Sequence, residues 1–149
     1  MKYYEDIEVG VTKKFGSYSV TREEVIEFAS KYDPQPFHLD DEAAAKTHFG
    51  KIPASGWHTA SMTMRMIVDD FKINKQAGLG GAGLEKLHWV KPVYPGDVLR
   101  CESECKSKRR SNSKKNMGIL CGETRTYNQN DELVMSMENT GLIAVRDSN

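Results

Sequence analysis

The sequence predicts an α+β fold in which an antiparallel sheet of about five strands wraps around one long helix. Two observations lead to this prediction. Apolar residues recur at helical spacing over one long stretch after Pro53, and four β-rich segments in the second half of the chain are separated by short turn sequences. Strands joined by such turns pair antiparallel. Because a chain of 149 residues makes one ordinary domain, we expect a single domain over residues 1–149.

The N-terminal part of the chain is predicted to form a strand followed by a helix. Residues 12–20 mix aromatic and β-branched residues with polar ones, which is typical of a strand. Thr21 and Glu24 have the spacing of a capping box and precede apolar residues at helical spacing, so we expect a helix over residues 22–32. Pro34 ends this helix, since proline cannot continue it.

A long helix is predicted to begin after Pro53, where apolar residues return at helical spacing. A short helix should precede it, because Asp40 is a good N-cap for the run that begins at Asp41. The expected apolar face of the long helix, widened by Met62 and Met66, consists of Trp57, Ala60, Met64, Ile67, Val68 and Phe71. The expected polar stripe opposite consists of His58, Ser61, Arg65 and Asp69.

Four strands are predicted in the second half of the chain, over residues 84–93, 98–106, 117–127 and 133–145. The glycine-rich segment 78–83 precedes the first of them and is expected to be a flexible turn from the long helix. It has the spelling G-x-G-x-x-G, but it follows a helix and opens a strand, the reverse of the order in a dinucleotide-binding fingerprint. We therefore expect no nucleotide cofactor at these glycines.

Composition and charge restrict the class of function. The chain has 21 Lys and Arg against 21 Asp and Glu, and a formal net charge of +0 lacks the electrostatic field of a general nucleic-acid binder. The three cysteines show no CxxC spacing, which is typical of reduced thiols, and no segment has the pattern of a secretion signal or a membrane span. We expect a cytoplasmic protein without a membrane or nucleic-acid partner. The histidines lack metal-ligand spacing, so no metal site is expected.

The densest candidate for chemistry is the segment from Asp33 to His38, in which a proline follows both Asp33 and Gln35. A residue before proline favours extended backbone, so this segment should be stiff. On a bent segment of this kind, a carboxylate and an imidazole can converge on one small molecule and hold a water, as adding or removing water across a double bond requires. The alternative interpretation is structural, with Asp33 capping a turn and His38 packing in the interior.

Three segments resemble one known family. Residues 28–40 are similar to the hydratase signature of the MaoC-like, (R)-specific enoyl-CoA hydratase family, in which Asp-x-Asn-Pro-(aliphatic)-His carries the catalytic dyad. Residues 52–61 resemble the start of the central helix of that family, and residues 87–97 resemble its Phe-x-x-Pro-Val-x-x-Gly-Asp strand and turn. The likeness covers nearly the whole chain and implies a hotdog fold, in which the sheet wraps around the central helix.

The resemblance implies roles for individual residues. Asp33 and His38 match the catalytic pair, and Gly56 matches the glycine whose backbone N–H binds the thioester carbonyl oxygen. A helix N-terminus suits that last role, because its unpaired N–H groups stabilise developing negative charge. Gln35 replaces the usual Asn, and Met64 falls where some members have a serine, so both are candidate substrate-binding residues.

The implied function is a hydratase or dehydratase that adds or removes water across the α,β double bond of an acyl thioester of coenzyme A or acyl carrier protein. No metal or redox cofactor is implied. Two copies are expected to pair edge to edge as a homodimer or a multiple of dimers. Ser55 stands where the family usually has His before the glycine. A thioesterase of the same fold and a non-catalytic acyl-thioester-binding module remain alternatives.

A cluster of six basic residues with no acid between them is expected at a hairpin tip. One interpretation is a solvated surface. In the other, the cluster meets the phosphates of coenzyme A, with Arg109 and Arg110 as candidate substrate-binding residues. The cluster consists of Lys106, Lys108, Arg109, Arg110, Lys114 and Lys115.

Overall fold

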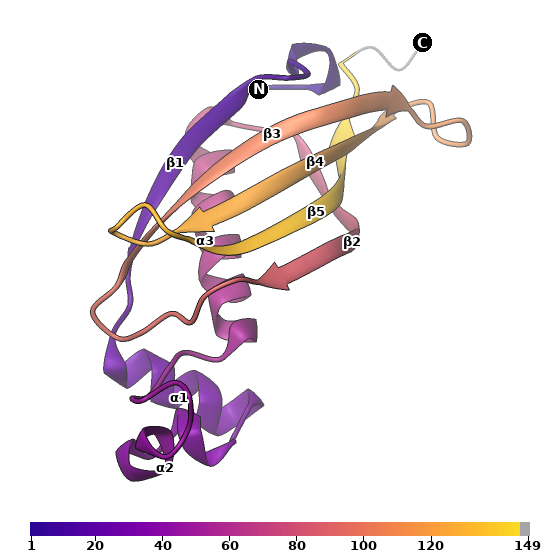
Figure 1. Cartoon of the computed structure of the whole chain (residues 1–149). Coiled ribbons are helices and arrows are strands. Elements are labelled where there is room, and N and C mark those ends of the chain that lie inside the picture. The colour runs from indigo at the N-terminus through magenta and orange to yellow at the C-terminus, as the bar shows by residue number, and fades with distance from the viewer. Residues whose placement is uncertain (147–149) are drawn as a thin grey trace.

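The computed structural model describes residues 1–146 and contains one antiparallel sheet and three α-helices. The helices are α1 (Arg22–Tyr32), α2 (Asp41–Ala45) and α3 (Gly56–Asn74), and the strands are β1 (Thr12–Ser19), β2 (Gly78–Trp89), β3 (Val98–Arg110), β4 (Met117–Tyr127) and β5 (Leu133–Ala144). The strand order is β1-β3-β4-β5-β2. Helix α3 lies along one face of the sheet, and α1 and α2 lie beyond one end of it (Figure 1). The predicted α+β architecture is confirmed.

The two short helices begin where their capping residues predict. The Thr21 side chain accepts a hydrogen bond from the Glu24 N–H, and the Asp40 side chain accepts one from the Ala43 N–H. In a complete capping box the Glu24 carboxylate would also accept a hydrogen bond from the Thr21 N–H. Here that carboxylate accepts from the Tyr18 hydroxyl instead. Helix α1 therefore has a conventional start but a first-turn carboxylate that is engaged elsewhere.

The buried face of helix α3 agrees with the predicted one in part, since Met62, Met66 and Ile67 are buried as expected. Trp57 and Met64, expected on the apolar face, are 60% and 47% exposed, whereas His58, expected on the polar stripe, is buried. The reason is Thr63, whose hydroxyl lies 2.7 Å from that of Thr126 on β4, so that a polar pair occupies the buried face. Apolar spacing alone does not reveal such a face. The buried residues of α3 are His58, Thr59, Met62, Thr63, Met66 and Ile67.

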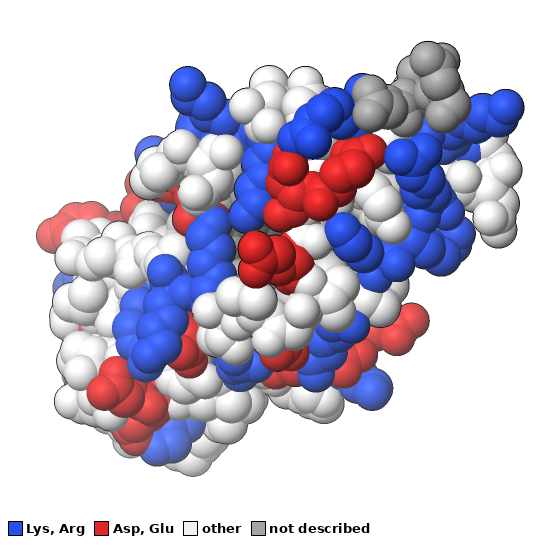
Figure 2. All heavy atoms as spheres, turned by 90° about the horizontal axis from the view of Figure 1, so that it is seen from above, with Lys and Arg blue, Asp and Glu red and all other residues white. Residues whose placement is uncertain are grey.

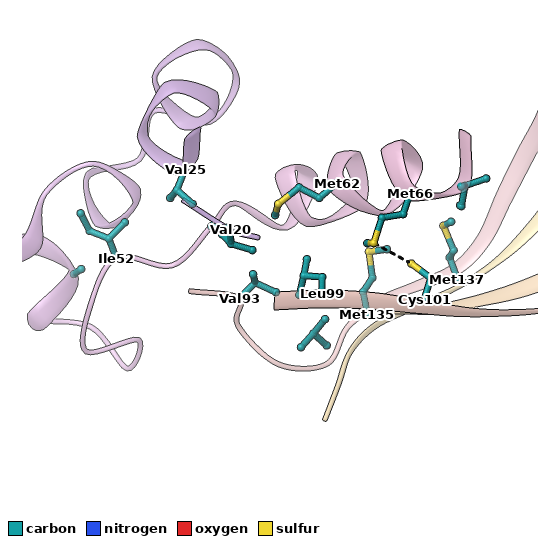
Figure 3. Close-up of a cluster of buried hydrophobic side chains, with 14 residues drawn as sticks. Val20, Val25, Ile52, Met62, Met66, Val93, Leu99, Cys101, Met135 and Met137 are labelled. Atoms are coloured by element: carbon teal, nitrogen blue, oxygen red, sulfur yellow. Dashed lines mark hydrogen bonds between the residues drawn. The ribbon is translucent and has the colours of Figure 1, made fainter. Parts of the chain in front are cut away.

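The core lies between α3 and the sheet (Figure 3). Met62 and Met66 point from the helix toward β3 and β5, and the Met66 Sδ lies 4.0 Å from the Cys101 Sγ. Burial raises the pKa of the Cys101 thiol to about 11, so this cysteine is a packing residue rather than a nucleophile. Unbranched methionines fill an irregular space well, which suits a helix seated on a curved sheet.

The glycine-rich segment 78–83 is not the flexible turn predicted from the sequence, because it forms the first half of β2. Pairing with β5 holds it in the sheet, and bulges accommodate its irregular register. Glycine is required at Gly80, where φ is +107°. The strand ends at Trp89 rather than at Val93, ahead of Pro92, which has no N–H to donate to a sheet.

Strand β3 also differs from the prediction. It continues past residue 106 to Arg110, so four of the six clustered basic residues lie in a strand and not in a hairpin tip. The turn between β3 and β4 spans only residues 111–116. Within residues 1–146, no helix combines the length and apolar character needed to cross a bilayer.

Gly16 of β1 lies where the sheet approaches helix α3 closely. Its φ is +84°, and a methyl group on it would lie 2.7 Å from the Met66 Sδ. We expect Gly16→Ala to lower the free energy of unfolding by about 2–5 kcal/mol, the sum of a left-handed backbone penalty and overpacking. Gly10→Ala is the matched control, because Gly10 has φ +86° and nothing within 4 Å. It should lose only about 1–2 kcal/mol in urea unfolding; equal losses would contradict the close contact with α3.

Candidate active site

The structure brings Asp33 and His38 together. Asp33 is the C-cap of α1, and His38 ends a 3₁₀ turn over Pro36–His38. Of the two residues that precede a proline, Gln35 has the expected extended backbone and Asp33 does not. The turn after Gln35 folds His38 back so that its Nε2 lies 3.2 Å from the Asp33 Oδ2. The His38 side chain is 6% exposed and that of Asp33 is 17% exposed. The pair therefore lies at the edge of the interior, with the carboxylate more exposed than the imidazole.

The backbone fixes which nitrogen of His38 carries a permanent proton. The Nδ1 lies 2.8 Å from the carbonyl oxygen of Pro53, which can only accept, so we assign the proton to Nδ1 as donor. The Nε2 is then the nitrogen that can gain or lose a proton, and it faces Asp33. This geometry leaves one transferable proton between the imidazole and the carboxylate.

Asp33 is held by two further hydrogen bonds. The Gln35 Nε2 donates to its Oδ1 at 2.7 Å, and the Ser55 Oγ donates to its Oδ2 at 2.7 Å. Burial raises the pKa of Asp33, but these two hydrogen bonds and the neighbouring His38 outweigh burial and hold the pKa below its ordinary value of 3.8. The carboxylate is therefore ionised at neutral pH and can accept a proton or a hydrogen bond.

The N-terminus of α3 begins directly beside this carboxylate. Ser55 is the N-cap residue of α3, yet its side chain makes no capping hydrogen bond, because the hydroxyl binds Asp33. The backbone N–H of Gly56 is at the first helical position, where the helix provides no acceptor. A helix start without a side-chain cap is suited to bind a partly negative oxygen.

Trp89 explains part of the need for glycine at position 56. A methyl group on Gly56 would lie 2.5 Å from an indole carbon of Trp89. The Trp89 ring also contacts the edge of the Trp57 ring, with centroids 5.2 Å apart. Both indoles remain partly exposed and form an aromatic wall beside the start of α3.

Of the four candidate substrate-binding residues from the sequence, Gln35 lies at this site, whereas Met64, Arg109 and Arg110 do not. Gln35 binds Asp33, so its amide supports the dyad. Met64 is an exposed residue of α3 with no contact to the dyad among the described interactions. Arg109 and Arg110 lie at the far end of β3, about 40 Å along the strand from its start.

Acidic and backbone groups engage much of the basic cluster. The Arg110 guanidinium lies 3.1 Å from Glu5, and Lys106 lies 2.8 Å from Glu123. Lys108 donates to the backbone carbonyls of Tyr4 and Ile7. Figure 2, which looks onto this end of the molecule, shows basic and acidic side chains side by side. Within one chain, the cluster is thus apart from the dyad, and Lys106 and Arg110 of the cluster pair with carboxylates.

Sequence reasoning missed two residues of the site. Ser55 was noted only as a departure from a family pattern, although a serine directly before a helix start is a polar group available to a neighbour. Trp89 carried no signal, because its contact with Gly56 joins β2 to α3 across the fold. Among residues 1–146 there is no cluster of three or more His, Cys, Asp or Glu side chains that could hold a metal.

A groove of about 310 Å³ lies on another side of α1 and α3. Tyr18, Glu24, Phe28 and His58 are among its lining residues, whereas Asp33 and His38 are not. The groove is therefore separate from the candidate active site.

Comparisons with known proteins agree with this architecture. Residues 7–126 match the family model described as MaoC like domain. The crystal structure of the MaoC-like dehydratase from Rhodospirillum rubrum is similar with a TM-score of 0.85 and 36% identity, covering 97% of this chain and 98% of that one.

Two curated relatives are similar in sequence. The uncharacterized protein YdeM of Bacillus subtilis is 30% identical over 93% of this chain and 96% of its own length. Mesaconyl-CoA hydratase of Cereibacter sphaeroides is 37% identical over 72% of this chain, and the match spans 30% of that enzyme. With the family model matching residues 7–126 and the sheet wrapped on a central helix, the chain belongs to the MaoC-like dehydratase family and has the hotdog fold.

Proposed function

We propose that this protein is a hydratase or dehydratase that adds or removes water across the α,β double bond of an acyl thioester, with coenzyme A or acyl carrier protein as the carrier. The observation that carries the proposal is the Asp33–His38 pair, 3.2 Å apart, beside the uncapped N-terminus of α3. The similarity to mesaconyl-CoA hydratase supports the same substrate class, although the chain matches only part of that enzyme.

The proposed hydration needs one group that stabilises the thioester oxygen and others that transfer protons. In hydration, a hydroxyl adds at the β-carbon and a proton at the α-carbon, while negative charge develops on the thioester oxygen. In the proposed reaction, the Gly56 N–H at the start of α3 stabilises that oxygen. Asp33 and His38 supply an acceptor and a donor for the two protons.

The proton balance follows from the hydrogen bonds of the pair. In the proposed cycle, Asp33 begins as a carboxylate and His38 begins with protons on both nitrogens, since Nδ1 faces the Pro53 carbonyl and Nε2 faces the Asp33 carboxylate, both of which are acceptors. As water attacks, Asp33 takes a proton from it and the His38 Nε2 gives its proton to the α-carbon. A proton transfer from Asp33 back to Nε2 restores the starting state, so no external acid or base is consumed. Dehydration is the same sequence in reverse.

We also propose that two copies pair through the free edge of β2. Nearly all residues of this strand are exposed, and it lies at one edge of the sheet. Leu84 and Trp89 on β2 and Trp57 on α3 are exposed apolar side chains, an unusual set for a monomer surface. Pairing would bury this surface and satisfy the unpaired backbone groups of the edge.

Substitution of either member of the pair tests the chemistry. We expect Asp33→Asn and His38→Gln each to lower kcat for enoyl thioester hydration by about two to four decades, because each removes one proton-transfer group. Circular dichroism should show an unchanged fold. A folded variant with turnover close to that of the unmodified protein would remove that residue from the mechanism.

Ser55→Ala tests the electrostatics of Asp33. Loss of the hydroxyl removes a hydrogen bond that stabilises the carboxylate, while burial continues to oppose ionisation, so the pKa of Asp33 should rise. Since the mechanism needs ionised Asp33, the acid limb of the kcat/KM profile should move to higher pH than in the unmodified protein. Ser61→Ala is the control, because the Ser61 hydroxyl bonds only the Trp57 carbonyl. An acid limb that stays in place in Ser55→Ala would contradict the assignment.

Leu84→Lys tests the assembly. A buried lysine at the β2 edge would oppose pairing, so sedimentation should show the unmodified protein as a dimer or a multiple of dimers and the variant as a smaller species. Val11→Lys places the same charge at an exposed apolar position just before β1, at the other edge of the sheet, and should leave the assembly intact. A monomeric unmodified protein would rule out the β2 interface.

A further inference from the structure

A second polar network links α1 to α3 away from the dyad. The His58 Nε2 lies 3.0 Å from the Glu24 Oε1, and the Tyr18 hydroxyl donates to the same oxygen. The His58 side chain is 3% exposed, and its ring stacks on Phe28 with centroids 4.7 Å apart and planes 7° from parallel. A buried imidazole that touches α1 at two residues is a fixed attachment and not a surface contact.

The protonation of this network can be assigned from its partners. The hydrogen bond from Tyr18 outweighs burial, and together with a weaker contribution from His58 it lowers the pKa of Glu24, so the carboxylate is an acceptor. His58 therefore donates from Nε2, and its buried Nδ1, which has no partner among residues 1–146, carries a lone pair and no proton. The His58 side chain thus uses its one N–H to donate to Glu24.

The attachment bears on Asp33 through helix α1. Glu24 is in the first turn of α1 and Asp33 is its C-cap, nine residues later and about 13 Å along the axis. His58 is in the first turn of α3, two residues after Gly56 and three after Ser55, which binds Asp33. Helix α1 is therefore tied to the start of α3 at both of its ends, and two ties fix its position and direction where one would leave it free to pivot.

We propose that His58 and Glu24 are positioning residues, which hold α1 so that the Asp33 carboxylate stays in register with His38 and the N–H of Gly56. This inference rests on the proposed function for its kinetic readout but not for its spectroscopic one. Neither residue touches the reacting atoms, and both act through the placement of α1. A displacement of about 1 Å at reacting groups can cost about 100-fold in rate, so such a tie has a measurable effect.

Replacement of His58 by two amides of different length provides the first test. The amide nitrogen of Gln lies near the place of Nε2 and can still donate to Glu24, whereas the shorter Asn cannot reach it. His58→Asn should lower kcat for an enoyl-CoA substrate about 10- to 100-fold with KM within about twofold, and His58→Gln should restore most of the loss. If His58→Asn does not fold, Glu24→Ala at a half-exposed position replaces it, with Glu24→Gln as its conservative partner.

Tyr18→Phe is the matched control. It removes a hydrogen bond from the same Glu24 oxygen but leaves the His58 tie in place. We expect a lower melting temperature and an unchanged kcat. If Tyr18→Phe lowers kcat as much as His58→Asn does, the loss of rate comes from a general weakening of the network and not from the contact of His58 with Glu24. That result would overturn the positioning role.

Imidazole ¹⁵N NMR gives a readout that needs no turnover. In the unmodified protein, both ring nitrogens of His38 should give protonated signals, because Nδ1 faces the Pro53 carbonyl and Nε2 faces the Asp33 carboxylate. The His38 signals should shift or broaden in His58→Asn and stay in place in Tyr18→Phe. Unchanged His38 signals together with unchanged kcat would overturn the proposal. A shift of these signals in a protein that hydrates no thioester would refute the proposed function and keep the positioning role.

Discussion

The hydrogen bond from Ser55 to Asp33 is the contact on which the candidate site depends, because it joins the end of α1 to the start of α3 across 22 residues of sequence. It places the carboxylate where His38 can reach it and helps to keep it ionised. The same bond diverts the N-cap side chain of α3 from the helix it would otherwise cap. One serine thereby holds the Asp33 carboxylate and leaves the N-terminus of α3 without a side-chain cap, and the proposed hydration uses both features.

The sheet determines where that helix begins. Thr63 and Thr126 form a buried hydrogen bond, and Met66 packs close to Gly16, so α3 has one orientation on the sheet. That orientation buries His58 against α1 and turns Trp57 toward Trp89 at the free edge of β2. The dyad and the exposed aromatic edge thus lie on elements that the same helix positions, which is why we connect the site to assembly through that edge.

The sequence predicts the position of an element correctly where neighbouring residues in the chain determine it. The capping residues Thr21 and Asp40 placed α1 and α2 correctly, and two prolines marked the segment that carries the dyad. The predictions were wrong where contacts between residues far apart in the sequence determine the structure. The buried face of α3 depends on Thr126, the glycine run is held in the sheet by β5, and the basic residues of β3 meet acids as far away in sequence as Glu5. The spacing of residues within one segment cannot predict these contacts, because only the complete fold brings the partners together.

The most direct test of the account is product analysis after incubation with a panel of short, branched and medium enoyl-CoA thioesters in deuterated water. The account predicts a 3-hydroxyacyl thioester with one deuterium at the α-carbon and no release of free coenzyme A. Free thiol as the product would instead identify a thioesterase. Tight binding of the thioesters without any conversion would identify a binding module, and either result would contradict the assignment of Asp33 and His38 as a hydration dyad.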